Sequence, residues 1–283
     1  MMGHYWRNTL KYGIRFLICC VIIMAGVALL IAQAGKITAK DQKAAEAITA
    51  AIMALGGEKN IDNIKSLILT GTTKYSSHGA VDETEIRILL PDNYLRIDKR
   101  IGYGTLQYAR ASSGESLNIG FTETGGPLGV PRANEVNRFA SLLIGALLKG
   151  DPVAPLIISA VADTSNKFSI AKETGVLGEI EFDPVRKYPL LISYKDAVRN
   201  LTIYKTTYND GKITSERGGS GNEEFVDSIM RFKDRIAVDG VMFPGTIVFE
   251  SRGKPISELK FENIQINPKL SLADFEIPNF PSR

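Results

Sequence analysis

Cysteine and histidine are nearly missing from this 283-residue chain, which has two of each. Both cysteines, Cys19 and Cys20, lie in an apolar stretch near the N-terminus, so the rest of the sequence can form no disulfide and no cysteine-ligated metal site. A body without cysteine is safe in an oxidising compartment. Beyond residue 34, His78 is the only imidazole that could serve in acid–base chemistry.

The shortage of histidine weakens any catalytic interpretation. A Ser-His-Asp set would have to use His78, which sits in a Ser-Ser-His-Gly turn and is better explained as a solvated side chain. Most carboxylates alternate with apolar residues, as at 179–181, which places them on the solvent face of a sheet. Because no base–nucleophile pair can be named, we predict that the protein is not an enzyme and has no cofactor.

Acidic residues keep two alternatives open. A patch for a cation could form from Asp82, Glu83 and Glu85, although solvation of a strand edge explains these residues equally well. Paired carboxylates facing one cleft could hydrolyse cell-wall or glycan material, but the sequence does not give the distance between them. A hydrolase is therefore a third hypothesis on function, and we predict no metal site.

The net charge of the chain is small, with 34 Lys and Arg against 31 Asp and Glu. Three of the cations, Arg7, Lys11 and Arg15, lie in residues 1–34, which contain no acid, so the remainder carries 31 charges of each sign. Binding to nucleic acid requires a basic face. A neutral body therefore argues against a nucleic-acid partner.

Residues 1–34 have the order of a secretory signal peptide: a short basic start, an apolar run at 16–32 and a small-x-small cleavage site at Ala32-Gln33-Ala34. The alternative is an uncleaved transmembrane anchor, because the 17 apolar residues are at the lower edge of the ~17–25 that span a bilayer. Whether the leader is cleaved or retained, its positively charged start stays on the cytoplasmic side of the membrane. We therefore expect the body, 35–283, in the periplasm, either exported or anchored to the inner membrane.

The most regular pattern lies in residues 231–267, where apolar and polar residues alternate as in strands with one buried face. Asp239-Gly240 suits a tight hairpin between two of these strands, because both central residues of a type I′ turn need positive φ. Gly253 can take positive φ in the next turn. The alternation slips near Glu262-Asn263, which predicts a β-bulge.

A helix is predicted at 38–55, where apolar residues recur at helical spacing. Thr38 and Asp41 resemble a capping box at its start, and Gly56-Gly57 ends it. Its apolar face must pack on a sheet.

Two further segments are predicted to be helical. The first, 134–149, is apolar nearly all round in its last turns, and the second, 153–161, is interrupted near Pro155. Helices this apolar are buried or lie beside something apolar.

Short strands separated by turns fill the rest of the chain, with no domain boundary, linker or repeat. Strands with this spacing are typical of a curled sheet or barrel. One mainly β (α+β) domain over 35–283 is therefore the simplest interpretation. The predicted strands lie at 64–72, 86–90, 95–97, 103–109, 116–121, 168–172, 177–183, 190–194 and 201–208.

The apolar helices and the alternating strands are compatible with two alternative arrangements of the protein interior. The helices can fill the sheet completely and make an ordinary core, which is the better interpretation for any single residue. They can also leave a slot between helix and sheet. Burial of each methylene gives about 0.8 kcal/mol, so a slot for one or two acyl chains could bind lipid tightly without polar specificity.

Short motifs along the body resemble the LolA/LolB-like superfamily of periplasmic lipoprotein carriers and the related bacterial outer-membrane-lipoprotein-sorting proteins. They follow a secretory leader and are mostly structural. The matching stretches are Ala54-Leu55-Gly56-Gly57, Ile64-Lys65-Ser66-Leu67 to Gly71, Pro91-Asp92 with Arg96, Asp234-Arg235, Val238-Asp239-Gly240-Val241-Met242-Phe243-Pro244, and Ile266-Asn267-Pro268 with Leu270, Phe275 and Pro278.

The resemblance implies a strongly curved, antiparallel, incomplete β-barrel whose concave face is plugged by helices, with an apolar cavity for acyl chains between them. No ligand residue of the family can be matched to a position in this chain. The candidate lining residues are Ile88 and Leu90 from the sheet and Phe139, Leu143, Ile144, Leu147, Ile157 and Ile158 from the two apolar helices.

The first hypothesis is a non-enzymatic periplasmic carrier of lipid or lipoprotein acyl chains in the bacterial cell envelope. The second is a membrane-anchored accessory or structural subunit of an inner-membrane or envelope protein complex, with the same fold used as a scaffold. An uncleaved leader would favour the second hypothesis.

Overall fold

The computed structural model describes residues 37–77, 79–90, 93–100, 106–111, 120–122, 127–128, 146–149, 156–173, 175–199, 203–209, 212–218 and 223–276. The predicted leader, its cleavage site and His78 lie outside this part of the chain. Within it, no helix combines the length and the apolar character needed to cross a membrane.

The predicted meander is formed by β14 (Glu223–Val238), β15 (Val241–Ser251) and β16 (Lys254–Ile266), paired antiparallel in that order. Asp239 (φ 48°) and Gly240 (φ 78°) join the first two strands with the positive φ angles that a type I′ turn needs. Arg252 (φ 51°) and Gly253 (φ 73°) repeat this geometry at the next turn. Both turns therefore agree with the sequence pattern.

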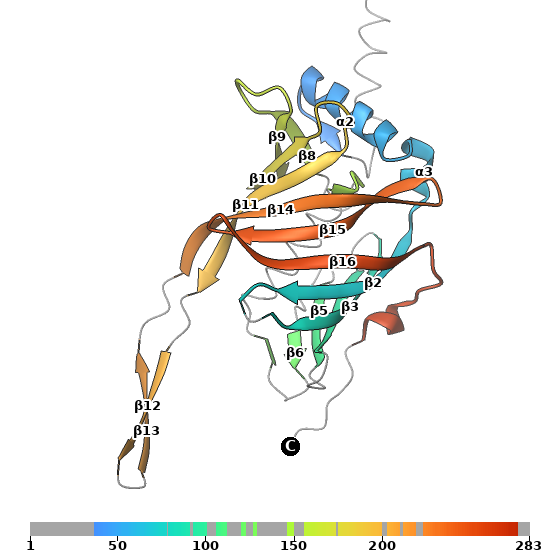
Figure 1. Cartoon of the computed structure of the whole chain (residues 1–283). Helices are drawn as coiled ribbons and strands as arrows, with labels where there is room; N and C mark the ends of the chain where they lie inside the picture. Colours follow the sequence, from blue (N-terminus) through green and yellow to red (C-terminus); the bar gives the residue numbers. More distant parts are fainter. Residues whose placement is uncertain are drawn as a thin grey trace, which may run out of the picture.

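The other strands extend this meander into one 14-stranded sheet, in the order β1-β8-β9-β10-β11-β14-β15-β16-β2-β3-β4-β5-β6-β7. In the described residues the two end strands do not pair, so the sheet is open, and its strands turn progressively across the molecule (Figure 1). The remaining bounds are β1 (Thr38–Ala39), β2 (Ser66–Tyr75), β3 (Val81–Leu89), β4 (Asn93–Arg100), β5 (Leu106–Ala111), β6 (Gly120–Thr122), β7 (Pro127–Leu128), β8 (Ile157–Ala160), β9 (Lys167–Lys172), β10 (Gly175–Phe182) and β11 (Pro189–Arg199).

The sheet is mixed, which corrects the prediction of a purely antiparallel one. Every neighbouring pair is antiparallel except β1 and β8, which run parallel. The residues of β1 were predicted to start a helix, but Thr38 N–H donates to the Leu156 carbonyl (2.8 Å) and Lys40 N–H to the Ile158 carbonyl (2.8 Å). These bonds hold the segment in an extended strand at the edge of the sheet.

The first helix, α2 (Gln42–Ala54), therefore begins later than predicted, with Asp41 as its N-cap. One carboxylate oxygen of Asp41 accepts from Ala44 N–H (2.8 Å), and the other accepts from Ala160 N–H in β8 (2.8 Å). The predicted end is confirmed, since Gly56 (φ 123°) and Gly57 (φ 85°) stop the helix. A short helix, α3 (Glu58–Asn63), follows.

The prediction of a helix at 153–161 is wrong where the structure describes it. Ile157–Ala160 is strand β8, which pairs with β9 as well as with β1. The β-branched Ile157 and Ile158 fit a pleated strand, and both edges of the strand find partners. Of the helix predicted at 134–149, only 146–149 is described, and its apolar residues there are buried.

One hairpin stands apart from the main sheet. β12 (Ile203–Asn209) and β13 (Lys212–Gly218) pair only with each other and project away from the body (Figure 1). The sequence predicted the first of these strands, at 201–208. It gave no sign that this pair forms a separate ribbon.

The bulge predicted near Glu262-Asn263 is confirmed, because the register between β16 and β2 shifts between Phe261 and Asn263. Phe261 stands opposite Gly71 in β2, and a Cβ added at Gly71 would lie 1.9 Å from the Lys260 carbonyl oxygen. The glycine therefore permits the close approach of two backbones at the bulge.

Substitution of Gly71 by alanine should lower the free energy of unfolding by about 1–3 kcal/mol, the usual range for overpacking. Urea unfolding followed by circular dichroism measures this change. Lys74→Ala, at an exposed position of the same strand, serves as the control and should change stability by less than about 1 kcal/mol. Equal stability of Gly71→Ala and the parent protein would contradict the close approach.

Candidate functional site

The face of the sheet that carries the buried apolar side chains, called the inner face here, is a single apolar surface. It runs from β9 and β10 through β14, β15, β16 and β2 to β3 and β4. Alternation along each strand produces it, as in β3, where Ile86 and Ile88 are buried and Arg87 between them is only partly so. The helix α2 packs on this core through Ala44, Ile48, Ala51 and Leu55.

The predicted lining residues fall into three groups. Ile88, Leu147 and Ile158 are each at least 96% buried and belong to the one apolar core, and Leu90 is half-buried against it. Ile157 is half-buried and follows the opposite face of β8 from Ile158. The others, Phe139, Leu143 and Ile144, lie outside the described residues. A role in lining a cavity stays a prediction for all eight.

A charged network interrupts the apolar inner face where β2, β3 and β4 run side by side. Thr84 donates its hydroxyl proton to Asp98 (2.7 Å), so Thr73 must donate to Thr84 (2.7 Å between the oxygens). Arg96 closes the ring with Nε on Asp98 (2.8 Å) and Nη2 on Thr73 (3.0 Å). The four side chains therefore satisfy one another in a setting where an unpaired charge would be costly.

Electrostatics within this network favour the charged form of Arg96. Burial, the largest single effect, lowers its pKa, but the Asp98 carboxylate, the Tyr94 and Tyr75 side chains and the hydrogen bond to Asp98 together hold the pKa above the ordinary value for arginine. The side chains of Arg96 and Asp98 are only 16% and 10% exposed. The inner face thus contains a buried ion pair beside its apolar surface.

A second ion pair extends the network toward the end of the strands. Arg100 binds Asp82 through Nε (2.9 Å) and Nη2 (3.3 Å), and its guanidinium lies over the Tyr75 ring. Asp82 is 1% exposed, whereas Glu83, its neighbour on β3, is exposed on the opposite face. The two do not share a face, so the structure does not assemble the acidic patch considered from the sequence.

Sequence reasoning missed this network because its members come from three strands. The signal was present in the alternation, since Asp82 and Thr84 continue the series of Ile86 and Ile88 on β3. Within the described residues, no group of three or more His, Cys, Asp or Glu could hold a metal ion.

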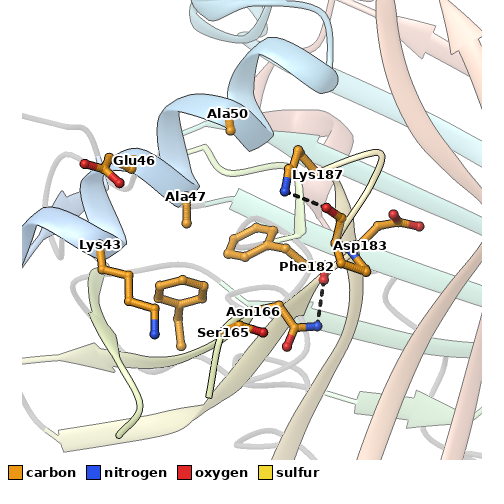
Figure 2. Close-up of a pocket in the computed structure, with 11 residues that line it drawn as sticks. Lys43, Glu46, Ala47, Ala50, Ser165, Asn166, Phe182, Asp183 and Lys187 are labelled. Carbon is orange, nitrogen blue, oxygen red and sulfur yellow. Dashed lines mark hydrogen bonds between the residues drawn. The ribbon is translucent and has the colours of Figure 1, made fainter. Parts of the chain in front are cut away.

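The structure also contains a groove of about 290 Å³ between α2 and the turns at the ends of β9 and β10 (Figure 2). Its floor combines the Phe168 and Phe182 rings, which meet edge to face with centroids 5.5 Å apart, with the methyl groups of Ala47 and Ala50. Polar side chains surround this floor, and they are Lys43, Glu46, Ser165, Asn166, Asp183 and Lys187.

Hydrogen bonds within the turns fix much of the groove. The Asp183 carboxylate accepts from Arg186 N–H (2.7 Å) and Val185 N–H (2.8 Å), which lowers the pKa of Asp183. Asn166 donates to the Phe182 carbonyl (3.1 Å). No sequence pattern pointed to this groove, because three separate segments build it.

Comparison with known proteins finds similarity at the level of three-dimensional structure only. No family model matches the chain, and no curated protein matches it. A structure described as an outer membrane lipoprotein-sorting protein domain, from Vibrio parahaemolyticus, covers 82% of this chain and 96% of its own, with a TM-score of 0.47 and 9% identity.

Two further structures show the same degree of similarity. A DUF1329 family protein from Desulfovibrio piger covers 82% of this chain and 96% of its own, with a TM-score of 0.46 and 10% identity. A LolA superfamily protein from Nitrosomonas europaea covers 80% and 97%, with a TM-score of 0.41 and 12% identity. Two of these descriptions name the lipoprotein-sorting and LolA proteins that the sequence motifs resemble.

Removal of Asp98 should destabilise the protein strongly. Asp98→Ala leaves the Arg96 guanidinium buried without its carboxylate, which should lower the free energy of unfolding by about 3–5 kcal/mol in a urea titration. Arg96→Met combined with Asp98→Leu should recover most of the loss, because neither position then carries a buried charge without its partner.

The matched control uses an exposed ion pair. Lys195 and Asp227 lie 2.5 Å apart, but their side chains are 64% and 81% exposed. Asp227→Ala should therefore change stability by less than about 1 kcal/mol. Similar losses for the Asp98 and Asp227 variants would contradict a special role for the buried network.

Proposed function

We propose that this protein is a non-enzymatic binding or carrier protein for lipid or lipoprotein acyl chains, and that the chains bind against the inner face. The observation that carries the proposal is the extent of this face. A single apolar surface spans the strands from β9 to β4 on an open sheet, and the described helix that packs on it, α2, contributes four buried side chains to that core.

The chemistry of the inner face suits acyl chains better than a polar ligand. Most of its buried side chains are Ile, Leu, Phe or Met, which offer dispersion contacts without hydrogen-bond specificity. Each methylene removed from water contributes about 0.8 kcal/mol, so a chain of ordinary length could bind tightly without a dedicated polar pocket. The buried network around Asp98 is satisfied internally and leaves the apolar part to select the ligand.

The leader predicted at 1–34 supports a location in the bacterial cell envelope. Either a cleaved signal peptide or a retained anchor would put the body in the periplasm, in one domain from 35 to 283. A carrier of acyl chains is useful in that compartment, since free chains do not cross an aqueous space unaided.

One observation favours a second function, that of an anchored accessory subunit of an envelope complex. The ribbon of β12 and β13 projects from the body and pairs with no other described strand (Figure 1). A projecting ribbon can engage another protein without disturbing the sheet.

Co-purification tests the carrier function. The protein, expressed with its leader and extracted from the envelope, should carry lipid in native mass spectrometry. Leu90→Glu, which puts a charge at the border of the apolar core, should remove most of that lipid, because an unpaired carboxylate opposes an acyl chain. Leu272→Glu is the control, since Leu272 is 65% exposed, and should retain the lipid.

Parent protein without lipid would contradict the carrier function, and so would equal retention of lipid by both variants when their melting temperatures show that both are folded.

N-terminal sequencing of membrane and soluble fractions separates the two candidate functions. For the carrier released into the periplasm, the mature chain should begin at Gly35. An N-terminus at Met1 or Met2 in the membrane fraction, together with stoichiometric partner proteins, would support the accessory subunit instead.

A further inference from the structure

We infer that the turn between β10 and β11, residues 183–188, is a binding site for a phosphate group, which Arg235 of β14 holds together with Arg186 and Lys187 of the turn. The phosphate is free or forms part of a small ester such as a lipid head group, because the three cations recognise the charged group that these ligands share. The site consists of polar side chains at the border of the inner face, and it does not depend on the proposed carrier function.

The backbone of β14 is strained directly before Arg235. Asp234 takes a left-handed conformation (φ 51°) within the strand, which residues other than glycine rarely adopt. In β15, a Cβ added at Gly245 would lie 2.1 Å from the Asp234 carbonyl oxygen, so only a glycine leaves room for this path of the chain. Strain of this kind is concentrated at functional sites, and here it sets the position of Arg235.

The guanidinium of Arg235 has no acid partner among the described residues. It lies over the Tyr188 ring, 4.4 Å from the ring centroid, and its Nη2 donates to the Pro189 carbonyl. The other two nitrogens, Nε and Nη1, are shielded from solvent and bind no acceptor within the described part of the chain. Burial lowers the pKa of Arg235 to about 10, so the group is still charged at neutral pH. Buried donors on a charged group destabilise the protein when they remain unpaired, and a bound anion removes that penalty.

Asp183, the acid of the turn, is already engaged within the turn itself. One oxygen of its carboxylate accepts both from Val185 N–H (2.8 Å) and from Arg186 N–H (2.7 Å). Its carbonyl accepts from Lys187 N–H (2.9 Å), which closes the turn (Figure 2). The negative charge of Asp183 raises the pKa of Arg235, but the two side chains form no ion pair. The charge of Arg235 is therefore open to an anionic ligand.

The turn adds two further cations next to Tyr188. Arg186 and Lys187 are exposed, and neither forms an ion pair with another described residue. Arg186 donates instead to the Tyr188 hydroxyl (3.0 Å), and Lys187 Nζ donates to a backbone carbonyl of the same turn (2.5 Å). The three cations of the site, against the one carboxylate of Asp183, leave two positive charges. A phosphate group matches them, because it carries about −1.5 to −2 at pH 7 and offers several acceptor oxygens to arginine and lysine.

Arg186 links the exposed part of the site to the buried part. The Tyr188 ring covers the Arg235 guanidinium, and the Tyr188 hydroxyl accepts from Arg186. A phosphate that binds Arg186 competes for this donor, which frees the Tyr188 side chain to rotate away. Nε and Nη1 of Arg235 then come within reach of the phosphate oxygens. Binding at the surface is thereby coupled to the uncovering of Arg235.

Isothermal titration calorimetry of the full chain in a nonionic detergent tests the inference, with potassium chloride at equal ionic strength as the reference. The parent protein should bind inorganic phosphate or glycerophosphoglycerol, the soluble head group of a phospholipid. Tighter binding of inorganic phosphate assigns the site to free phosphate, whereas tighter binding of glycerophosphoglycerol assigns it to a lipid head group. The inference fails if the parent protein binds neither probe.

Replacement of Arg235 separates binding from stability. Arg235→Met should weaken binding of the better probe at least about tenfold, because it removes the charged donors. Without phosphate, the same variant should melt at the parent temperature or higher, because it removes a buried charge that lacks an acid partner. Arg252→Met removes an exposed cation that pairs with Glu224 (2.7 Å) and should leave phosphate binding unchanged. A folded Arg235→Met variant that binds as tightly as the parent overturns the inference.

Two variants of the turn test the coupling. Arg186→Gln, an exposed change that leaves the fold intact, should weaken binding about 2–5-fold, the value of one exposed ion pair. Tyr188→Phe deletes the hydroxyl and keeps the ring, and it should tighten binding because the bond from Arg186 no longer has to be broken. Unchanged affinity in Arg186→Gln, or weaker binding in Tyr188→Phe, would contradict the site.

Discussion

The fold depends on burial of the inner face. Fourteen strands in one open sheet present a long apolar surface that cannot remain in water. The helix α2 contributes four small or aliphatic side chains to the core, and Asp41 fixes its position by capping the helix and binding β8 with the same carboxylate. Local structure and packing are therefore coupled through one residue.

The meander was predictable because its determinants are local. Asp239-Gly240 fixes a turn, alternation fixes the buried face, and the slip in that alternation marks the bulge opposite Gly71. Residues 38–41 and 157–160 were misjudged for the opposite reason. Their strands β1 and β8 exist because two segments more than a hundred residues apart pair with each other, and propensity cannot report such a partner.

The candidate sites also divide into features with a local sequence signal and features that only distant segments make together. Alternation on β3 contained the information that Asp82 and Thr84 share a face with Ile86, but only the arrangement of three strands reveals the closed ring with Asp98 and Arg96. The groove beside α2 had no signal at all in the sequence, since Lys43, Phe168 and Phe182 come from three segments. Function in this fold follows from surfaces that distant segments make together.

The edge strand β1 has a mechanical consequence. It is two residues long, directly follows the region predicted to hold the leader, and is attached to β8 by the backbone bonds of Thr38 and Lys40. If residues 1–34 tether the protein, a pulling force along the chain loads these two bonds before it reaches the other strands of the sheet. Rupture at β1 would then lengthen the tether by a few residues and leave the pairing of the other strands intact.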